Sequence, residues 1–327
     1  MFPTSLLARA ARAAVLSTVA ACGAFVSATP AMAAAPMVKT QAPGYFRLML
    51  GDFEVTAVSD GTVPLPVDQL LQQPAAKTKA ALANAHLAVP TETSVNAFLI
   101  NTGAKLVLVD AGAGNLFGPT LGKLLDNLRA AGYTPEQVDD VVITHLHADH
   151  VGGVVAQGAM AFPNANVHVD KRDADFWLSK ARMDAAPDEG KAAFQGAMVS
   201  LGPYISAGKF KPFAADGEIV PGVRSMATYG HTEGHSVYVV ESKGQKLMLI
   251  GDLIHVGAVQ FDHPEVTIKF DTDRQRAAKA RAQVFARAAK EGAWVGASHL
   301  QFPGLGHLQA VGKGYRWIPA NYSTLLK

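Results

Sequence analysis

The sequence contains almost no cysteine. Its single cysteine, Cys22, lies near the N-terminus of the 327-residue chain. A disulfide framework is therefore excluded, and a chain that begins after residue 33 has no thiolate for catalysis or metal binding. Any metal centre in such a chain must be built from His, Asp or Glu side chains.

The sequence also lacks a large excess of charge of either sign. It has 29 Lys and Arg residues against 27 Asp and Glu residues, and removing Arg9 and Arg12 with the first 33 residues leaves 27 of each. No tract of basic residues is present that would bind nucleic-acid phosphates. We therefore expect no nucleic-acid partner, and a small substrate that is not strongly anionic.

The first 33 residues have the pattern of a secretory signal peptide. Arg9 and Arg12 precede an apolar run from residue 13 to residue 26, and Ala31-Met32-Ala33 offers the small residues after which a signal peptidase cleaves. The run is short for a permanent membrane anchor. We expect an exported protein, periplasmic or secreted. Because Val19-Ala20-Ala21-Cys22 also matches a lipoprotein cleavage box, attachment through a lipid on Cys22 stays an alternative.

Beyond residue 33 the sequence predicts one large folded domain. Apolar residues make up 49% of the sequence and charged residues 17%, which favours a globular body with a full core. Residues 34–44 are small, non-periodic and contain proline, so we interpret them as a linker or N-terminal arm. No change in composition marks a second domain, and the folded domain is expected to span residues 45–327.

Hydrophobic patterns after residue 45 predict both strands and helices. Paired strands are expected at 46–50 and 53–59, around a Gly51-Asp52 turn, and at 94–101 and 105–110. Helices are expected at 121–131, 173–180, 191–201 and 273–291, and further strands at 138–144, 223–228, 236–241, 246–250, 294–297 and 315–319. Strands that come first in pairs and later alternate with helices favour two face-to-face sheets with helices outside, an α/β fold of four layers, αββα.

The densest chemical signal follows the predicted strand at 138–144. Within His145-Leu146-His147-Ala148-Asp149-His150, three imidazoles and a carboxylate occupy six residues. Side chains alternate along an extended strand end, so His145 and His147 should point to the same side. Imidazole nitrogens and carboxylate oxygens suit zinc and its first-row neighbours. So many histidines beside a buried apolar strand are difficult to explain as solvated loop residues, and they predict a metal site.

Three more candidate ligands also follow predicted strands. These residues are His231, Asp252 and His299, and each lies just after the end of a predicted apolar strand. Loops at strand ends converge on one face of a fold and often carry functional residues. Taken alone, each residue has an ordinary alternative as a capping Asp or a core His. Their combined order after the dense motif is far more specific than any single residue.

With these residues in this order, the sequence resembles the metallo-β-lactamase superfamily, and within it most closely the methyl parathion hydrolases. The likeness extends over the whole mature chain and includes stretches such as Gly51-Asp52-Phe53-Glu54 and Phe302-Pro303-Gly304. The resemblance implies the αββα sandwich and a homodimer. His150 stands where many true β-lactamases of this fold have Cys. This difference counts against antibiotic hydrolysis as the native activity.

The resemblance also implies a ligand set and a mechanism. His145, His147 and His231 would hold one divalent metal ion, Asp149, His150 and His299 a second, and Asp252 would bridge them. Zinc is the expected metal, with Mn, Fe or Co as alternatives. Two cations about 3.5–4 Å apart share a water molecule and lower its pKa, so that the resulting hydroxide attacks a carbonyl or phosphoryl centre. Asp149 is expected to pass a proton to the leaving group.

Several other histidines and one more aspartate are not expected to be metal ligands. Asp110 is expected to accept an N–H from a ligand histidine, with a simple turn residue as the alternative. His235 is expected to be structural rather than a ligand. The remaining histidines are not expected to bind metal: His86, His168, His263 and His307.

The resemblance places Phe117, Trp177 and Phe194 around an aromatic substrate pocket, with ordinary core packing as the alternative. The sequence departs from the methyl parathion hydrolases at His255, where those enzymes have an aliphatic residue, and at Ile268 and Phe270. The segment around residues 188–191 is also one residue shorter. His255 could hydrogen-bond a planar ester or protonate a leaving alkoxide, and a bulky Phe270 leaves less room for a tetrahedral phosphotriester.

These observations favour a lactonase or arylesterase that acts on small neutral aromatic lactones and esters, with organophosphate triesters as a side activity. A phosphotriesterase of the methyl parathion hydrolase type as the main activity is the alternative. Two other classes stay open: a diiron redox enzyme on the same fold and a non-catalytic metal-binding protein.

Overall fold

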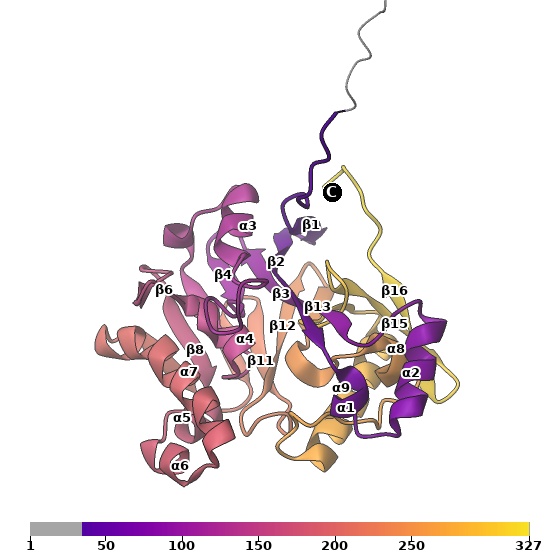
Figure 1. Ribbon diagram of the computed structural model, residues 1–327. Coiled ribbons are helices and arrows are strands. Elements are labelled where there is room, and N and C mark those ends of the chain that lie inside the picture. Colours follow the sequence, from indigo (N-terminus) through magenta and orange to yellow (C-terminus); the bar gives the residue numbers. More distant parts are fainter. Residues whose placement is uncertain (1–34, 327) are drawn as a thin grey trace, which may run out of the picture. The chain divides into compact units, whose positions relative to one another are not determined.

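The computed structural model describes residues 35–326 (Figure 1). The expected signal peptide, residues 1–33, and the lipoprotein alternative at Cys22 therefore lie outside the described residues. Residues 35–39 have no regular secondary structure, and the first strand begins at Tyr45. Within residues 35–326, no helix has the length and the apolar composition needed to cross a membrane.

A first sheet of seven strands is formed by the N-terminal part of the chain, in the order β1-β2-β3-β4-β5-β8-β9. Neighbours from β1 to β4 pair antiparallel, and β4, β5, β8 and β9 pair parallel. The bounds are β1 (Tyr45–Leu50), β2 (Phe53–Leu65), β3 (Thr91–Asn101), β4 (Leu106–Val109), β5 (Asp140–Val142), β8 (Asn166–Asp170) and β9 (Phe210–Phe213). Parallel pairing brings the C-terminal ends of β4, β5 and β8 to the same edge of the sheet.

A second sheet of seven strands follows the chain order from β10 to β16. Its neighbours pair antiparallel except β13 and β14, which are parallel. The bounds are β10 (Gly217–Val220), β11 (Val223–Ala227), β12 (Ser236–Ser242), β13 (Gln245–Leu249), β14 (Trp294–Gly296), β15 (Leu305–Val311) and β16 (Gly314–Pro319). A separate two-stranded hairpin consists of β6 (Val155–Ala156) and β7 (Ala159–Met160).

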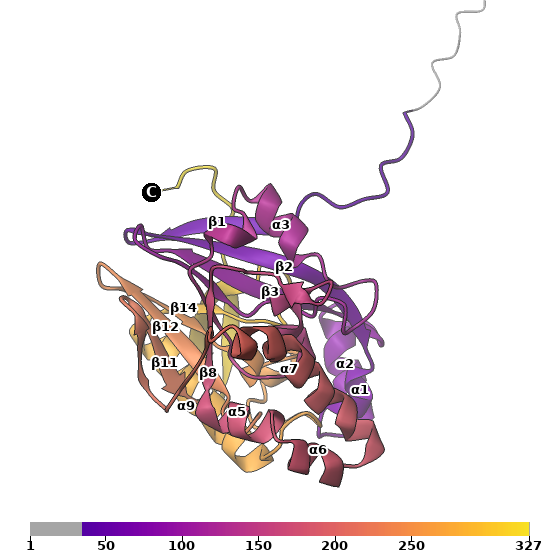
Figure 2. The ribbon, with the colours of Figure 1, turned by 90° about the vertical axis from the view of Figure 1, so that its left-hand side faces the viewer.

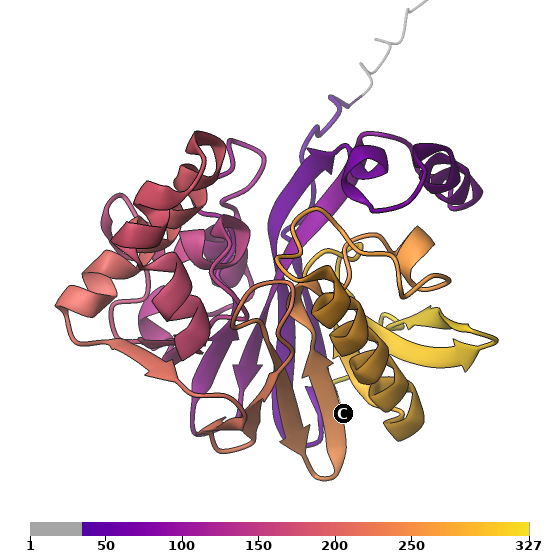
Figure 3. The same cartoon turned by 90° about the horizontal axis from the view of Figure 1, so that it is seen from below.

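Helices cover the outer face of each sheet. The bounds are α1 (Val67–Leu70), α2 (Ala75–Asn84), α3 (Leu124–Ala130), α4 (Ala148–Val151), α5 (Lys171–Trp177), α6 (Lys180–Ala185), α7 (Asp188–Ser206), α8 (Gly257–Gln260) and α9 (Arg274–Glu291). Helices α3, α5 and α7 contact the first sheet, whereas α9 contacts the second (Figures 2 and 3). Helix α9 begins where the Asp273 side chain accepts the N–H of Arg276, and it ends at Gly292 in the left-handed region.

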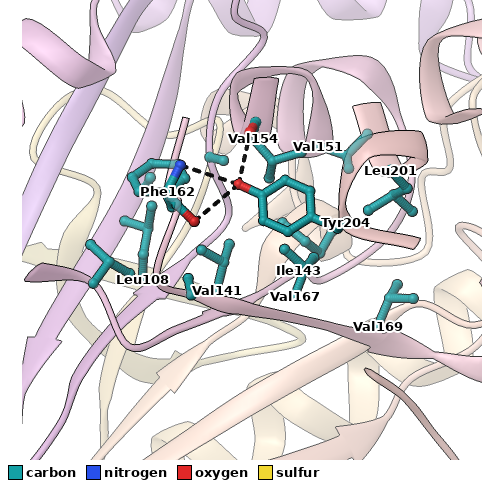
Figure 4. Close-up of a cluster of buried hydrophobic side chains, with 14 of the residues drawn as sticks. Leu108, Val141, Ile143, Val151, Val154, Phe162, Val167, Val169, Leu201 and Tyr204 are labelled. Carbon is teal, nitrogen blue, oxygen red and sulfur yellow. Dashed lines mark hydrogen bonds between the residues drawn. The ribbon is translucent and has the colours of Figure 1, made fainter. Parts of the chain in front are cut away.

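Three apolar clusters fill the spaces between these layers. In the first, strand residues such as Val141 and Val167 pack against Leu201 and Tyr204 of α7, whose hydroxyl donates to the carbonyl of Val154 (Figure 4). The second lies between the two sheets and the third between the second sheet and α9. Three buried interfaces require four layers, so the predicted αββα architecture is confirmed.

Candidate active site

Loops from both sheets supply the candidate ligands. His145 and His147 lie between β5 and α4, and Asp149 and His150 lie in α4 itself. His231 follows β11, Asp252 lies in a single turn of 3₁₀-helix after β13, and His299 follows β14. All seven predicted ligands are brought into two adjacent groups, although they are up to 154 positions apart in the sequence, from residue 145 to residue 299. The sheet edges therefore assemble a site that no single segment contains.

The first group consists of His145, His147, His231 and Asp252. Nδ1 of His147 lies 3.0 Å from Nε2 of His145 and 3.2 Å from Nε2 of His231. Oδ2 of Asp252 lies 3.2 Å from the same nitrogen of His231 and 3.5 Å from that of His145. Three imidazole nitrogens and one carboxylate oxygen thus face a common point.

The second group consists of Asp149, His150 and His299. Oδ2 of Asp149 lies 3.7 Å from Nε2 of His150 and 3.5 Å from Nε2 of His299. The other carboxylate oxygen of Asp252, Oδ1, lies 3.1 Å from each of these two nitrogens. Asp252 therefore presents one oxygen to each group, which is the arrangement that a bridging ligand requires.

The donor set fits two divalent cations. Nε2 of His150 and Oδ1 of Asp252 are buried and make no hydrogen bond with another described residue. Buried polar atoms without hydrogen-bond partners are costly, so two such atoms that face each other suit the binding of a cation. Nitrogen and oxygen ligands without sulfur suit zinc, manganese, iron or cobalt.

Outer contacts fix the rings of three of these histidines. Nδ1 of His150 donates to Asp110 at 2.8 Å, Nδ1 of His231 donates to Asp271 at 2.9 Å, and Nδ1 of His299 donates to the carbonyl of Ser94 at 2.9 Å. In each case the proton on Nδ1 leaves Nε2 free to face the site. The contact of Asp110 was expected from the sequence, whereas that of Asp271 was not, because nothing in the sequence pairs Asp271 with a histidine 40 residues away.

His235 takes a structural position beside Asp252. Its Nε2 accepts the backbone N–H of Asp252 at 3.1 Å, and its Nδ1 lies 2.8 Å from the hydroxyl of Thr228. Gly251 adopts a φ of +50°, and a Cβ there would lie 2.7 Å from this Nε2. His235 and the glycine together hold the turn that aims Asp252. Within residues 35–326, none of the histidines at 86, 168, 263 and 307 joins a metal-binding group.

The charges of the cluster depend on each other. Burial alone would raise the pKa of Asp252, but the imidazoles of His150, His299 and His255 lower it well below its ordinary value. Burial, together with the charge of His231, lowers the pKa of His147 to about 3. Burial would also lower the pKa of His231, but its hydrogen bonds and charge interactions with Asp252 and Asp271 raise that pKa to about 9. Because an ionised carboxylate and a neutral imidazole are the forms that coordinate metal ions, metal binding at His231 requires the loss of a proton.

A cavity of about 630 Å³ opens over the cluster. Its floor includes Asp149, Asp252 and His299, and its walls carry apolar side chains together with His255. The apolar walls come from Val63, Leu65, Leu116, Phe117, Ala192, Ala193, Val199 and Phe270. Nε2 of His255 lies 3.1 Å from Oδ2 of Asp252, while its Nδ1 is buried without a hydrogen-bond partner among the described residues.

Two of the expected pocket residues require correction. Trp177 and Phe194 are buried in the cluster between the first sheet and its helices, and they are not among the residues that line the cavity. The reason is the helical period of α7, which points Phe194, Ala197 and Leu201 toward the core. Trp177 instead contacts the ring of His147 edge-on, at 5.4 Å between centroids, so it supports a candidate ligand. Phe117 and Phe270 do line the cavity, as expected.

Comparisons with known proteins agree with this architecture. The family model described as the metallo-beta-lactamase superfamily matches residues 90–299, more than half of the chain. The structure is similar to that of AbOPH, a hydrolase in the β-lactamase superfamily, at a TM-score of 0.83 and 38% identity, covering 87% of this chain and 100% of that one. It is also similar to AidC, a dizinc quorum-quenching lactonase in complex with the product N-hexanoyl-L-homoserine, at a TM-score of 0.79 and 27% identity, covering 86% and 99%.

Curated relatives match over shorter lengths. An N-acyl homoserine lactonase of Bacillus cereus is 27% identical over 172 residues, which cover 47% of this chain and 60% of the relative. The matched regions span between 39% and 60% of the curated relatives' own lengths. The fold, the converging candidate His and Asp ligands and the matching family model lead to one conclusion: the chain belongs to the metallo-β-lactamase superfamily.

Proposed function

We propose that the protein hydrolyses small neutral lactones and aryl esters with the help of two divalent cations, for which zinc is the expected metal. The observation that carries this proposal is the cavity itself. It joins apolar walls to a floor of candidate metal ligands, and no Lys or Arg is among its lining residues. A neutral ester with an apolar substituent suits such a pocket better than an anionic substrate does.

In this proposal each group of ligands would bind one of the two cations. His145, His147 and His231 hold one cation, Asp149, His150 and His299 hold the other, and Asp252 contributes to both. When bound, such cations act as Lewis acids and lower the pKa of a water molecule toward neutrality. The hydrolysis breaks the acyl C–O bond, the oxygen of water enters the carboxylate product, and the leaving alkoxide takes up a proton.

Asp149 and His255, which both line the cavity, can take part in that proton balance. Asp149 is partly exposed to the cavity, with 19% of its side chain accessible, so its carboxylate can accept a proton and pass it to the alkoxide. His255 lines the same cavity, and its ring stacks on that of His299 at 5.0 Å between centroids. An imidazole at this position can donate a hydrogen bond to the ester or protonate the leaving group.

His255 and Phe270 also favour a planar substrate over a tetrahedral one. Their rings lie 6.0 Å apart on one side of the cavity. A flat lactone ring needs less space beside these two rings than a phosphotriester, whose two alkoxy arms project out of the plane. The lactonase names of AidC and of the Bacillus relatives support the same preference. We also propose that, within the superfamily, the chain has a closer likeness to the methyl parathion hydrolases. That likeness supports the hydrolysis of organophosphate triesters as a weaker side activity.

A substrate panel tests the proposal. Metal-replete protein is assayed for kcat/KM on an aryl lactone, an N-acyl homoserine lactone, an aryl ester and methyl parathion. We expect the lactones or the aryl ester to give the highest value. A far higher kcat/KM for methyl parathion would show that the phosphotriesterase alternative is correct.

Export and assembly belong to the proposal as well. Residues 1–33 are expected to direct the chain out of the cytoplasm, with cleavage after Ala33 or a lipid on Cys22 as the two alternatives. Mass spectrometry of the protein isolated from cell fractions distinguishes these N-termini. Light scattering of the purified protein tests the expected homodimer.

A further inference from the structure

Asp173 is a buried carboxylate that connects two of the ligand-bearing loops. It is the third residue of α5 and its exposed fraction is 0%. Its Oδ2 accepts the backbone N–H of Leu146 at 2.8 Å, and its Oδ1 accepts that of Gly234 at 2.6 Å. The two oxygens of one side chain therefore hold two loops that are 88 residues apart in the sequence, from residue 146 to residue 234.

Both loops carry ligands of the first group. Leu146 lies between His145 and His147, and Gly234 lies three residues after His231. The first loop follows a strand of one sheet and the second loop follows a strand of the other, so Asp173 bridges the two sheets at the site. The second group is fixed by other contacts, because His150 donates to Asp110 and His299 donates to the carbonyl of Ser94.

Close packing around Asp173 restricts the distance between α5 and the loop that contains Gly234. A Cβ on Gly234 would lie 2.5 Å from the backbone nitrogen of Asp173, so the loop can approach α5 closely only as glycine. Asp170 adds a second tether, because its Oδ2 accepts the hydroxyl of Tyr229 at 3.0 Å. Burial raises the pKa of Asp173 to about 6, which is a cost that the fold bears at this position.

A carboxylate suits this place because it offers two acceptors and no donor. The amide of an asparagine offers one acceptor, and its NH₂ group would face one of the two N–H groups. One loop would then lose its tether. We propose that Asp173 is a positioning residue that sets the spacing of His145, His147 and His231, and that it controls the affinity of this group for its cation independently of the second group.

The test measures zinc affinity in two backgrounds by competition with a chromophoric chelator. His299→Ala disables the second group and leaves the first, whereas His231→Ala disables the first and leaves the second. Asp173→Asn should weaken zinc binding by about 10- to 100-fold in the His299→Ala background. It should leave zinc binding unchanged in the His231→Ala background.

Asp175→Asn is the matched control, because Asp175 lies on the same helix, is exposed and, among the described residues, pairs only with Lys171. It should change neither affinity. Equal weakening in both backgrounds would show a general structural role for Asp173, and no weakening in the first would also overturn the proposal. If Asp173→Asn does not fold, Gly234→Ala decides the question, since its Cβ would displace the His231 loop from α5 and should give the same asymmetry.

The proposal rests on a two-cation site but not on the substrate. Zinc affinity is measured without any ester, so a failure of the lactone assay leaves this test intact. Conversely, loss of the asymmetry would leave the proposed hydrolysis untouched.

Discussion

Asp110 and Asp252 face opposite nitrogens of the same imidazole ring, that of His150. Oδ2 of Asp110 lies 2.8 Å from Nδ1 of His150, and Oδ1 of Asp252 lies 3.1 Å from Nε2 of that ring. Asp110 also accepts both the backbone N–H and the hydroxyl of Thr144, and it does so with a φ of +60°. An aspartate tolerates this region better than most residues, and its contacts explain why the backbone adopts it here.

Asp110→Asn should weaken the second group of ligands. The neutral amide no longer increases the basicity of His150, and partners of this kind change metal affinity by about 10- to 100-fold. The measurement is the affinity for zinc in the His231→Ala background, where only the second group is complete. Asp126→Asn, at an exposed position, should have no effect. An Asp110→Asn protein with unchanged affinity would show that this contact is only structural.

His255→Leu should lower the activity on an aryl lactone and raise the activity on methyl parathion. Removing the imidazole should lower kcat/KM for an aryl lactone by about 100-fold, as expected for the loss of a general acid. The same change should raise kcat/KM for methyl parathion, because the leucine leaves the cavity less polar. His263→Leu is the matched control, since its side chain is 62% exposed and lies on the same segment. No gain on methyl parathion would contradict the account of substrate preference.

Val199→Arg should weaken the binding of substrates with long apolar substituents. Val199 is 62% exposed and lines the cavity, whereas Ile205, on the same helix, is 48% exposed and does not. A charge at the apolar mouth should raise KM by about tenfold with little change in kcat, since the interaction is lost equally in the ground and transition states. Ile205→Arg should leave both constants unchanged. Equal effects of the two variants would mean that this part of the cavity does not contact substrate.

Asp140 should contribute stability that depends on pH. Burial would raise the pKa of this carboxyl, but the hydrogen bond from His168 at 2.8 Å and the charge of Lys105 lower it below its ordinary value of 3.8. A lowered pKa stabilises the fold above pH 3.8, and the contribution is lost as the pH falls through the folded-state value.

Asp140→Asn should therefore reduce the free energy of unfolding by about 1 kcal/mol at pH 7 and by much less at pH 3. Urea unfolding with a chelator present measures the difference without a metal contribution. Asp184→Asn, an exposed change on α6, is the control. A penalty of equal size at both pH values would contradict the assignment.

Much of the fold follows from local patterns in the sequence. The hairpin at 46–59, the helix at 273–291 and the strands at 223–250 lie within a few residues of β1, β2, α9 and β11–β13, because their alternation and caps are local signals. Helices α1 and α2 and the strands β8, β9 and β15 were not predicted. Short elements with polar residues depend on their neighbours for pairing, which local patterns do not contain.

The candidate site, like the fold, could be predicted only in part from the sequence. Its seven candidate ligands, which the structure brings together, could be predicted because each follows a buried strand and their order is specific. The contacts of Asp271, Asp173 and Gln260 were missed, because their partners lie elsewhere in the chain or are backbone groups. Gln260, for example, accepts the N–H groups of His255 and Val256 and so shapes the turn that carries a cavity residue. Phe194 was expected at the pocket, with core packing as the alternative, and it lies in the core, since a single residue does not reveal which face of a helix points inward.

The most direct test of the central claim is the number of metal ions bound by each chain. Purified protein is loaded with zinc, freed of excess metal and measured by elemental analysis, before and after extraction with a chelator. We predict two zinc ions per chain, loss of ester hydrolysis with the metal, and recovery when zinc is returned. Fewer than two ions in the loaded protein, or full activity after exhaustive extraction, would contradict the account.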